Sequence, residues 1–247
     1  MIEGIGFFEF VTDGWRDPLG SLECELEKKA CRFHDAPVVL PEFFNCGDRC
    51  DPGDVPAIGA LQTRRFLAQF SRKYRVAFVA ALVDEPSRFN SAYLIDADLA
   101  DDPWRLLCHK RFDDCSKLYE PFTQEQSSRN PLFWKGVHVA ALICNDAAFG
   151  GYEKMLATLK LNAERSVVCI PARMGFESFQ NDPILNPHDA PGPYSVLANS
   201  KPGGCPSFIA GRRGFKAVQC GSSGANALAV RTWAELDTWE GLCNRWQ

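Results

Sequence analysis

The chain has 247 residues, of which 46% are hydrophobic, 12% aromatic and 23% charged, and its formal net charge is −4. This is the composition of a soluble globular protein with enough apolar material for a sizeable core. The mild acidity, without basic runs interleaved with aromatic residues, argues against nucleic acid as a partner. No stretch approaches the roughly 18 consecutive apolar residues of a membrane span. The start, MIEGIGFFEFVTDGW, lacks the charged region and cleavage site of a secretory signal.

The cysteine content points to a reducing compartment. The 11 cysteines are odd in number and scattered over the whole chain, whereas secreted disulfide scaffolds are usually shorter and even-numbered. We therefore interpret them as reduced thiols and expect a cytoplasmic protein. Cys46 and Cys50 form a C-x3-C pair, but no second pair at zinc-site spacing accompanies them, so we expect no metal site.

Apolar patterning predicts strands and helices in alternation along the chain. A strand (4–10) is followed by a helix (17–34) that Asp17 is placed to cap, a buried strand (36–44), a helix (56–74) opened by Pro56, and a buried strand (75–83). A hairpin with a long loop (90–96 and 104–112) precedes another buried strand (137–144) and a helix (149–161), and the strand series continues at 165–172, 194–200 and 207–215. This order predicts a single-domain α/β fold over 1–247, with sheets covered by helices.

Three predicted core strands end in side chains that can do chemistry. Glu42 follows VVLP, Lys110 lies near the end of LLCHKRF, and Cys144 closes VHVAALIC. Each alone has a structural explanation, because a carboxylate can cap a segment, a lysine can extend its ammonium to the surface, and a free cysteine often packs as a small hydrophobe. All three at strand ends favour a shared function, since buried charges are usually paired or functional.

The chemistry that these side chains allow is nucleophilic acyl transfer. A thiol becomes a nucleophile when a nearby base takes its proton, and Glu42 is the candidate base. Lys110, together with the backbone N–H of Asn145, is placed to stabilise an oxyanion. A Cys-His arrangement is the weaker alternative. His138 lies six residues before Cys144 on the same strand, too far to contact it, and the other three histidines have no supporting motif or point away (His34, His109 and His188).

The segments that carry these residues resemble motifs of the nitrilase, or carbon–nitrogen hydrolase, superfamily. LPEFF resembles the family's Pro-Glu-aromatic motif, CHKRF its lysine segment and LICNDAAFG its cysteine motif, in the family's order of Glu, Lys and Cys. Further similar segments are NSAYLID before the lysine, CIPA, and LANSKPGGCPSFI with Asn199 and Ser207. Together they cover nearly the whole chain.

The resemblance implies a four-layer α-β-β-α sandwich, usually assembled as a homodimer or larger homo-oligomer. It implies cleavage of a small-molecule amide through a thioester on Cys144, with Glu42 as general base and Lys110 as oxyanion stabiliser, and it requires no organic cofactor or metal. Nitrile hydrolysis or acyl transfer at the same site, a catalytically impaired binding or scaffold protein, and a redox-sensing thiol protein are the alternatives.

Two details of the match leave choices open. Lys117, in KLYEPFTQE, is an alternative catalytic lysine. With Lys117 the family's second carboxylate would be Glu125, and with Lys110 it would be Glu120. We prefer Lys110 because it falls on the predicted strand. The chain also has Asn145 where the family usually has an aromatic residue, and Gly150 where it usually has proline; the first departure bears on specificity.

Overall fold

The fold is taken from a computed structural model of the chain. The residues that it describes are 3–9, 17–29, 36–46, 58–111, 131–147, 166–173, 193–200, 207–210 and 227–238.

Six strands form the first sheet, in the order β11-β1-β2-β3-β4-β5. β1, β2 and β3 run parallel, while β11, β4 and β5 are antiparallel to their neighbours. The bounds are β1 Gly4–Glu9, β2 Pro37–Val39, β3 Ala77–Val83, β4 Asn90–Ile95, β5 Trp104–His109 and β11 Ala227–Thr232.

Five strands form the second sheet, in the order β10-β9-β8-β7-β6. β7, β8 and β9 are parallel, and an antiparallel strand closes each edge. The bounds are β6 Leu132–Trp134, β7 Val137–Ala141, β8 Ser166–Ala172, β9 Tyr194–Asn199 and β10 Phe208–Ala210.

Strand side chains alternate between two cores. In β3, Val79 and Ala81 pack in the core between the two sheets, while Phe78 and Leu82 pack in the core under the helices. This follows from the two-residue period of a strand, which sends neighbouring side chains to opposite faces. The continuous apolar run of β3 is therefore buried on both sides, as parallel strands within layered folds usually are.

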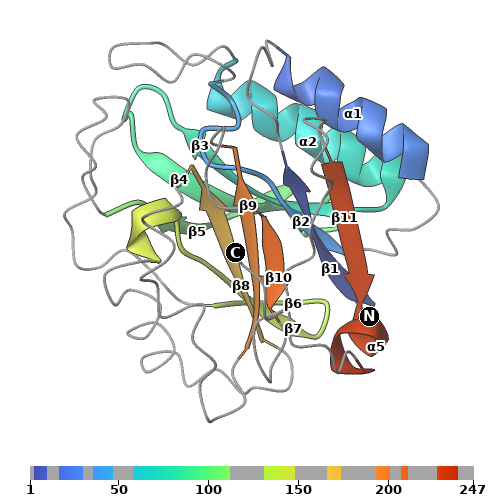
Figure 1. The fold of residues 1–247 in the computed structure, drawn as a ribbon. Coiled ribbons are helices and arrows are strands. Elements are labelled where there is room, and N and C mark those ends of the chain that lie inside the picture. Colours follow the sequence, from blue (N-terminus) through green and yellow to red (C-terminus); the bar gives the residue numbers. More distant parts are fainter. Residues whose placement is uncertain are drawn as a thin grey trace.

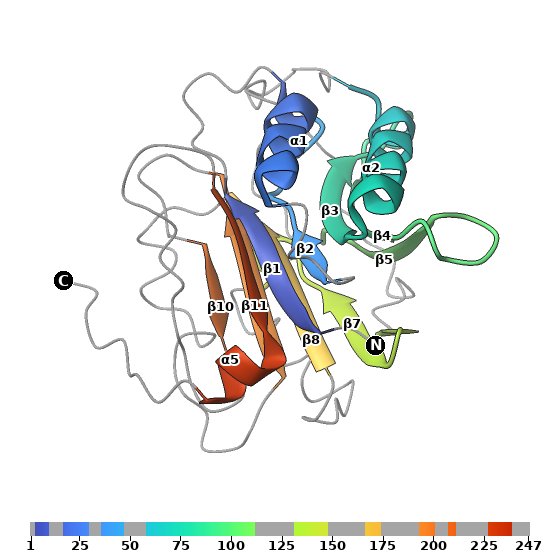
Figure 2. The same ribbon diagram turned by 90° about the vertical axis from the view of Figure 1, so that its right-hand side faces the viewer.

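Two helices cover the outer face of the six-stranded sheet (Figures 1 and 2). They are α1, Pro18–Lys29, and α2, Ala60–Tyr74. The Asp17 carboxylate accepts a hydrogen bond from the Gly20 N–H at 2.9 Å, which confirms Asp17 as the cap of α1. The order of layers is helices, sheet, sheet, in agreement with the predicted mixed α/β architecture. The helix predicted at 149–161, which would cover the second sheet, lies outside the described residues.

Some predicted boundaries are wrong. The strand predicted at 36–44 ends at Val39, and α2 begins at Ala60 rather than near Pro56. β6 and β11 were not predicted, and neither was α5, Trp233–Thr238. Lys110 does not lie on a strand, because β5 ends at His109. A short α5 is the last described helix, and no helix in the described ranges is long and apolar enough to cross a membrane.

Candidate active site

The candidate active site lies where strands of both sheets end. Glu42 comes after β2, Lys110 after β5 and Cys144 after β7. β5 runs in the same direction as β2 and β3, since it is antiparallel to β4, which is antiparallel to β3. Glu42 and Lys110 therefore lie at the same edge of the first sheet, the edge formed by the carboxyl ends of β2, β3 and β5. Cys144, which follows β7 of the second sheet, lies next to them.

Glu42 and Lys110 form a buried ion pair. The Lys110 Nζ lies 2.6 Å from the Glu42 Oε1. Lys110 is 0% exposed and Glu42 is 1% exposed. The Asn90 Nδ2 donates a second hydrogen bond to the same oxygen at 2.8 Å, and the Asn90 carbonyl accepts the Lys110 N–H at 2.7 Å. Two charges removed from water are tolerated when they are paired and further hydrogen-bonded. Asn90 supplies that support to both partners.

Cys144 begins a short 3-10 turn, η1 (Cys144–Asp146), and Leu142 and Ile143 separate it from the end of β7. Its backbone has φ of 49°, a left-handed conformation that residues other than glycine seldom adopt and that often marks a functional site. The residue is 3% exposed. The thiol lies 3.9 Å from the Asn145 Oδ1 and donates to it. Asn145 is half-buried and follows the thiol directly.

The neighbours of Cys144 set its titration. Burial, and then the negative charge of Glu42, raise the pKa of the thiol well above its usual value. The positive charge of Lys110 and a hydrogen bond from the Arg173 backbone lower that pKa in part. Both charged groups therefore act on the sulfur. A thiol kept protonated in this way needs a base before it can attack, and the Glu42 carboxylate is next to it.

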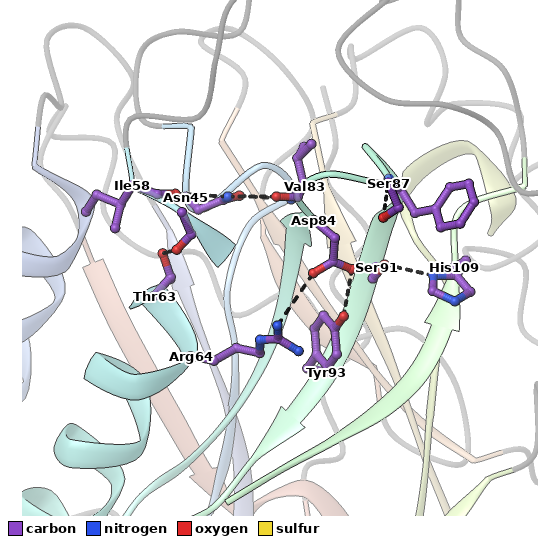
Figure 3. A network of polar contacts seen from close by, with 12 residues as sticks. Asn45, Ile58, Thr63, Arg64, Val83, Asp84, Ser87, Ser91, Tyr93 and His109 are labelled. Atoms are coloured by element: carbon purple, nitrogen blue, oxygen red, sulfur yellow. Dashed lines mark hydrogen bonds and ion pairs between the residues drawn. The ribbon is translucent and has the colours of Figure 1, made fainter. Parts of the chain in front are cut away.

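The turn after Glu42 is held by Asn45, which is fully buried. Its side chain pairs with both backbone groups of Val83, accepting from the N–H at 2.9 Å and donating to the carbonyl at 3.1 Å. It also donates to the Ile58 carbonyl at 3.2 Å. Figure 3 shows this side chain reaching from the turn to the end of β3. Asn45 therefore ties the turn that carries Glu42 to the neighbouring strand.

A second polar cluster fastens α2 to the sheet beside this turn (Figure 3). The Tyr93 hydroxyl donates to Asp84 at 2.6 Å, and the Arg64 guanidinium lies 4.4 Å from the centre of the Tyr93 ring. Burial and the Asp84 charge raise the pKa of Tyr93, so the phenol stays protonated and keeps its donor role. These contacts hold α2 against β4 and against Asp84, which directly follows the Val83 that Asn45 binds.

The remaining sequence predictions fall into two groups. Lys117, Glu120 and Glu125 lie outside the described residues. The histidines that the structure describes have other neighbours. The His109 Nδ1 lies 2.8 Å from the Ser91 hydroxyl, and the His138 ring packs 5.0 Å from the Phe133 ring. In the described ranges no group of three His, Cys, Asp or Glu side chains could hold a metal ion.

Three supporting residues were missed by the sequence analysis: Asn90, Asn45 and Asp146. Their partners are remote in the sequence, so no short motif predicts these contacts, although Asp146 itself lies within LICNDAAFG. Asn90 had one available signal, since a polar residue opens a strand, NSAYLI, that is otherwise fit for the core.

Solved structures with the same fold include amidases and a carbon–nitrogen hydrolase. The amidase of Nesterenkonia sp. AN1, from the nitrilase superfamily, matches with a TM-score of 0.63 at 22% identity over 92% of this chain and 90% of its own. A second structure of that amidase, with acrylamide added at its active-site cysteine, matches at 0.63 and 21% over 92% of both chains. The carbon–nitrogen hydrolase of Helicobacter pylori G27 matches at 0.63 and 17% over 93% of this chain and 89% of its own.

These similarities establish the fold. The chain has the fold of nitrilase-superfamily amidases, which confirms the resemblance drawn from its sequence at that level. No protein-family model and no curated protein sequence matches the chain.

Proposed function

We propose that the chain is a thiol amidohydrolase that cleaves the C–N bond of a small-molecule amide. The observation that carries the proposal is the Glu42–Lys110 ion pair, buried at 2.6 Å, whose charges both act on the Cys144 thiol. The fold, shared with amidases, supports it. In one structure of a mutant of the Nesterenkonia amidase a small amide, butyramide, is present in complex with the protein, and we propose the same class of ligand as the substrate of this chain.

In the first half-reaction Glu42 takes the thiol proton while the Cys144 sulfur attacks the amide carbon. The carbonyl oxygen gains negative charge, which the Lys110 ammonium and the Asn145 N–H stabilise. The tetrahedral intermediate collapses, the C–N bond breaks, and the leaving nitrogen takes the proton from Glu42. The product is a thioester on Cys144 and a free amine or ammonia.

In the second half-reaction water replaces the amine. Glu42 takes a proton from the water while the water oxygen attacks the thioester carbon. Lys110 and the Asn145 N–H again stabilise the oxyanion. The C–S bond breaks, the sulfur regains a proton, and the carboxylic acid leaves. The raised pKa of Cys144 fits this cycle, because the thiol starts protonated and its proton is delivered to the leaving nitrogen.

Iodoacetamide labelling with intact-mass detection, followed by peptide mapping, tests the proposal. We expect Cys144 to label faster than the other thiols near neutral pH, and Cys144→Ala to abolish that fast adduct. In Glu42→Gln the labelling should slow, because the acceptor of the thiol proton is lost, which outweighs the lower thiol pKa that follows from removing the carboxylate charge. Its rate should then rise by about tenfold per pH unit, because the thiol must ionise unaided. Hydrolysis of short aliphatic amides, followed by ammonia release, should disappear in both variants.

Two results would count against this function. Labelling of Cys144 no faster than that of the other thiols would favour the impaired scaffold protein. Fast labelling without hydrolysis of any amide would leave an activated thiol that acts on another class of substrate, such as a nitrile.

The single domain over 1–247, the homo-oligomer and the cytoplasmic location stay predictions. Light scattering of the purified protein would give the oligomeric state, and limited proteolysis would show whether the chain resists cleavage as one unit.

A further inference from the structure

The candidate site is divided between the two sheets. Glu42 and Lys110 come from the six-stranded sheet, while Cys144 comes from the five-stranded one. The distance from the ammonium to the thiol therefore depends on how the two sheets are held together at this edge. Errors of about 1 Å in such positions can cost about a hundredfold in rate.

Asp146 connects the two halves. It ends the η1 turn, two residues after Cys144, and is 7% exposed. Its two carboxylate oxygens accept the backbone N–H of Arg111 at 2.9 and 3.2 Å. Arg111 directly follows Lys110, whose own N–H is bound to the Asn90 carbonyl at 2.7 Å. The lysine segment is thus fixed to its own sheet by Asn90 and to the thiol's turn by Asp146.

A second contact crosses between the sheets at the same edge, and it is weaker. The Glu42 N–H donates to the Ala172 carbonyl, at the end of β8, at 3.4 Å. A hydrogen bond to a charged acceptor is shorter and roughly twice as strong as one between neutral groups. Asp146 is accordingly the better candidate for the contact that fixes the thiol's turn against the lysine segment.

We propose that Asp146 is a positioning residue, which holds the Lys110 ammonium against the Cys144 thiol across the two sheets. This inference rests on the proposed function for its kinetic consequences, but not for its effect on the thiol. Because Lys110 lowers the pKa of Cys144, loss of the link should raise the thiol pKa and slow attack by the sulfur.

The chain offers a matched control at the opposite edge of the sheets. Asp96 is also a buried carboxylate, 3% exposed, and also links the sheets, since its Oδ2 accepts the Trp134 Nε1–H at 2.7 Å. It follows β4, at the end away from Asn90. Asp96→Asn should therefore weaken the fold without changing the chemistry of the thiol.

The experiment compares Asp146→Ala, Asp146→Asn and Asp96→Asn with the wild type. Three quantities are measured: the melting temperature, kcat and KM for a short aliphatic amide, and the iodoacetamide labelling rate of Cys144 as a function of pH. For Asp146→Ala we expect kcat to fall by about a hundredfold with KM changed by less than about threefold. The labelling rate near neutral pH should fall by about tenfold and recover as the pH rises.

Asp146→Asn keeps one acceptor for the Arg111 N–H, so it should restore most of kcat and of the labelling rate. Asp96→Asn removes the charge that pairs with Lys135 at 3.0 Å, so it should lower the melting temperature and leave kcat and the labelling rate near the wild type. The inference is overturned if Asp146→Ala lowers only the melting temperature, as is expected for Asp96→Asn. It is also overturned if Asp146→Asn restores neither kcat nor the labelling rate. If Asp146→Ala does not fold, Asp146→Ser takes its place. Serine also removes the carboxylate, and its hydroxyl leaves a polar group in the turn.

The labelling measurement separates this inference from the proposed function. Labelling needs no amide substrate, so a pH-dependent loss in Asp146→Ala would support the positioning role even if the wild type hydrolysed no amide. Amide hydrolysis that survives unchanged in Asp146→Ala would instead sink the positioning role and leave the proposed function standing.

Discussion

At the scale of single residues, the Glu42–Lys110 pair links catalysis to stability. Both side chains are buried, so each charge depends on the other. Lys110→Met would leave the Glu42 carboxylate in a dry site without its cation. Removing one partner of a buried pair usually costs about 3–5 kcal/mol, and we expect this loss in the free energy of unfolding by urea, followed by tryptophan fluorescence.

The matched control is the double variant Glu42→Gln/Lys110→Met. It removes both charges at similar volume, and the Gln side chain can still accept the Asn90 amide. We expect the double variant to be more stable than Lys110→Met alone, although it should be inactive. The pair would contribute little to the fold if the loss in the double variant equalled the sum of the losses in Glu42→Gln and Lys110→Met. A loss below about 1 kcal/mol in Lys110→Met would show the same.

The sequence predicts the three candidate catalytic residues better than it predicts the residues that hold them in place. Glu42, Lys110 and Cys144 are chemical side chains at the ends of apolar runs, and that pattern can be recognised locally. Asn45 and Asp146 bind backbone groups of Val83 and Arg111, which are remote in the sequence. A polar residue gives no sign of which distant backbone group it will meet, so these roles required the fold.

At the scale of elements, the end of β1 carries a titratable group outside the proposed mechanism. Burial raises the pKa of Glu9 from 4.5 to about 7, against a hydrogen bond from the Ser207 backbone that lowers it. Between these two values the folded state binds more protons at Glu9 than the unfolded state does. The stability that Glu9 contributes is therefore present at low pH and is lost as the pH rises towards and through about 7.

We predict that Glu9→Gln reduces this loss, because glutamine does not ionise. Melting temperatures at about pH 5 and about pH 8 would measure it, with the wild-type fall between them larger than the fall in the variant. Since other groups also titrate in this range, only the difference between the two proteins is interpreted. Equal falls, or a larger fall in Glu9→Gln, would contradict a raised Glu9 pKa.

The elements that were predicted correctly are those with a strong period. α2 and β3 show continuous helical and strand patterns, and both are present. β6 is only three residues long, which leaves little period to detect. Its turn did carry a signal: Lys135 and Gly136 both have positive φ, the pattern of the two-residue turn that joins antiparallel strands. The Lys-Gly pair between LFW and VHVAA could have been interpreted in that way.

At the scale of the whole molecule, the alternation of strands and helices predicts layers but not how the sheets are fastened to each other. Apolar side chains fill the core between the sheets, and such packing is not directional. Polar links at the two edges supply direction. Asp146 links the sheets at the edge that holds the candidate site. Asp96 links them at the other edge, where it also forms an ion pair with Lys135 at 3.0 Å.

This arrangement predicts that Trp134→Phe separates stability from activity. The variant keeps an aromatic ring in the core but removes the Nε1–H that Asp96 accepts at 2.7 Å. A hydrogen bond to a charged group contributes about 1.5–3 kcal/mol, and the remaining Lys135 contact should hold the loss near the lower value. Urea unfolding should show this destabilisation, while kcat and the labelling rate of Cys144 should match the wild type under conditions where both proteins are folded. A fall in kcat out of proportion to the unfolded fraction would mean that displacement at this edge reaches the thiol. The two sheets would then move as coupled bodies, and the packing between them would not isolate one edge from the other.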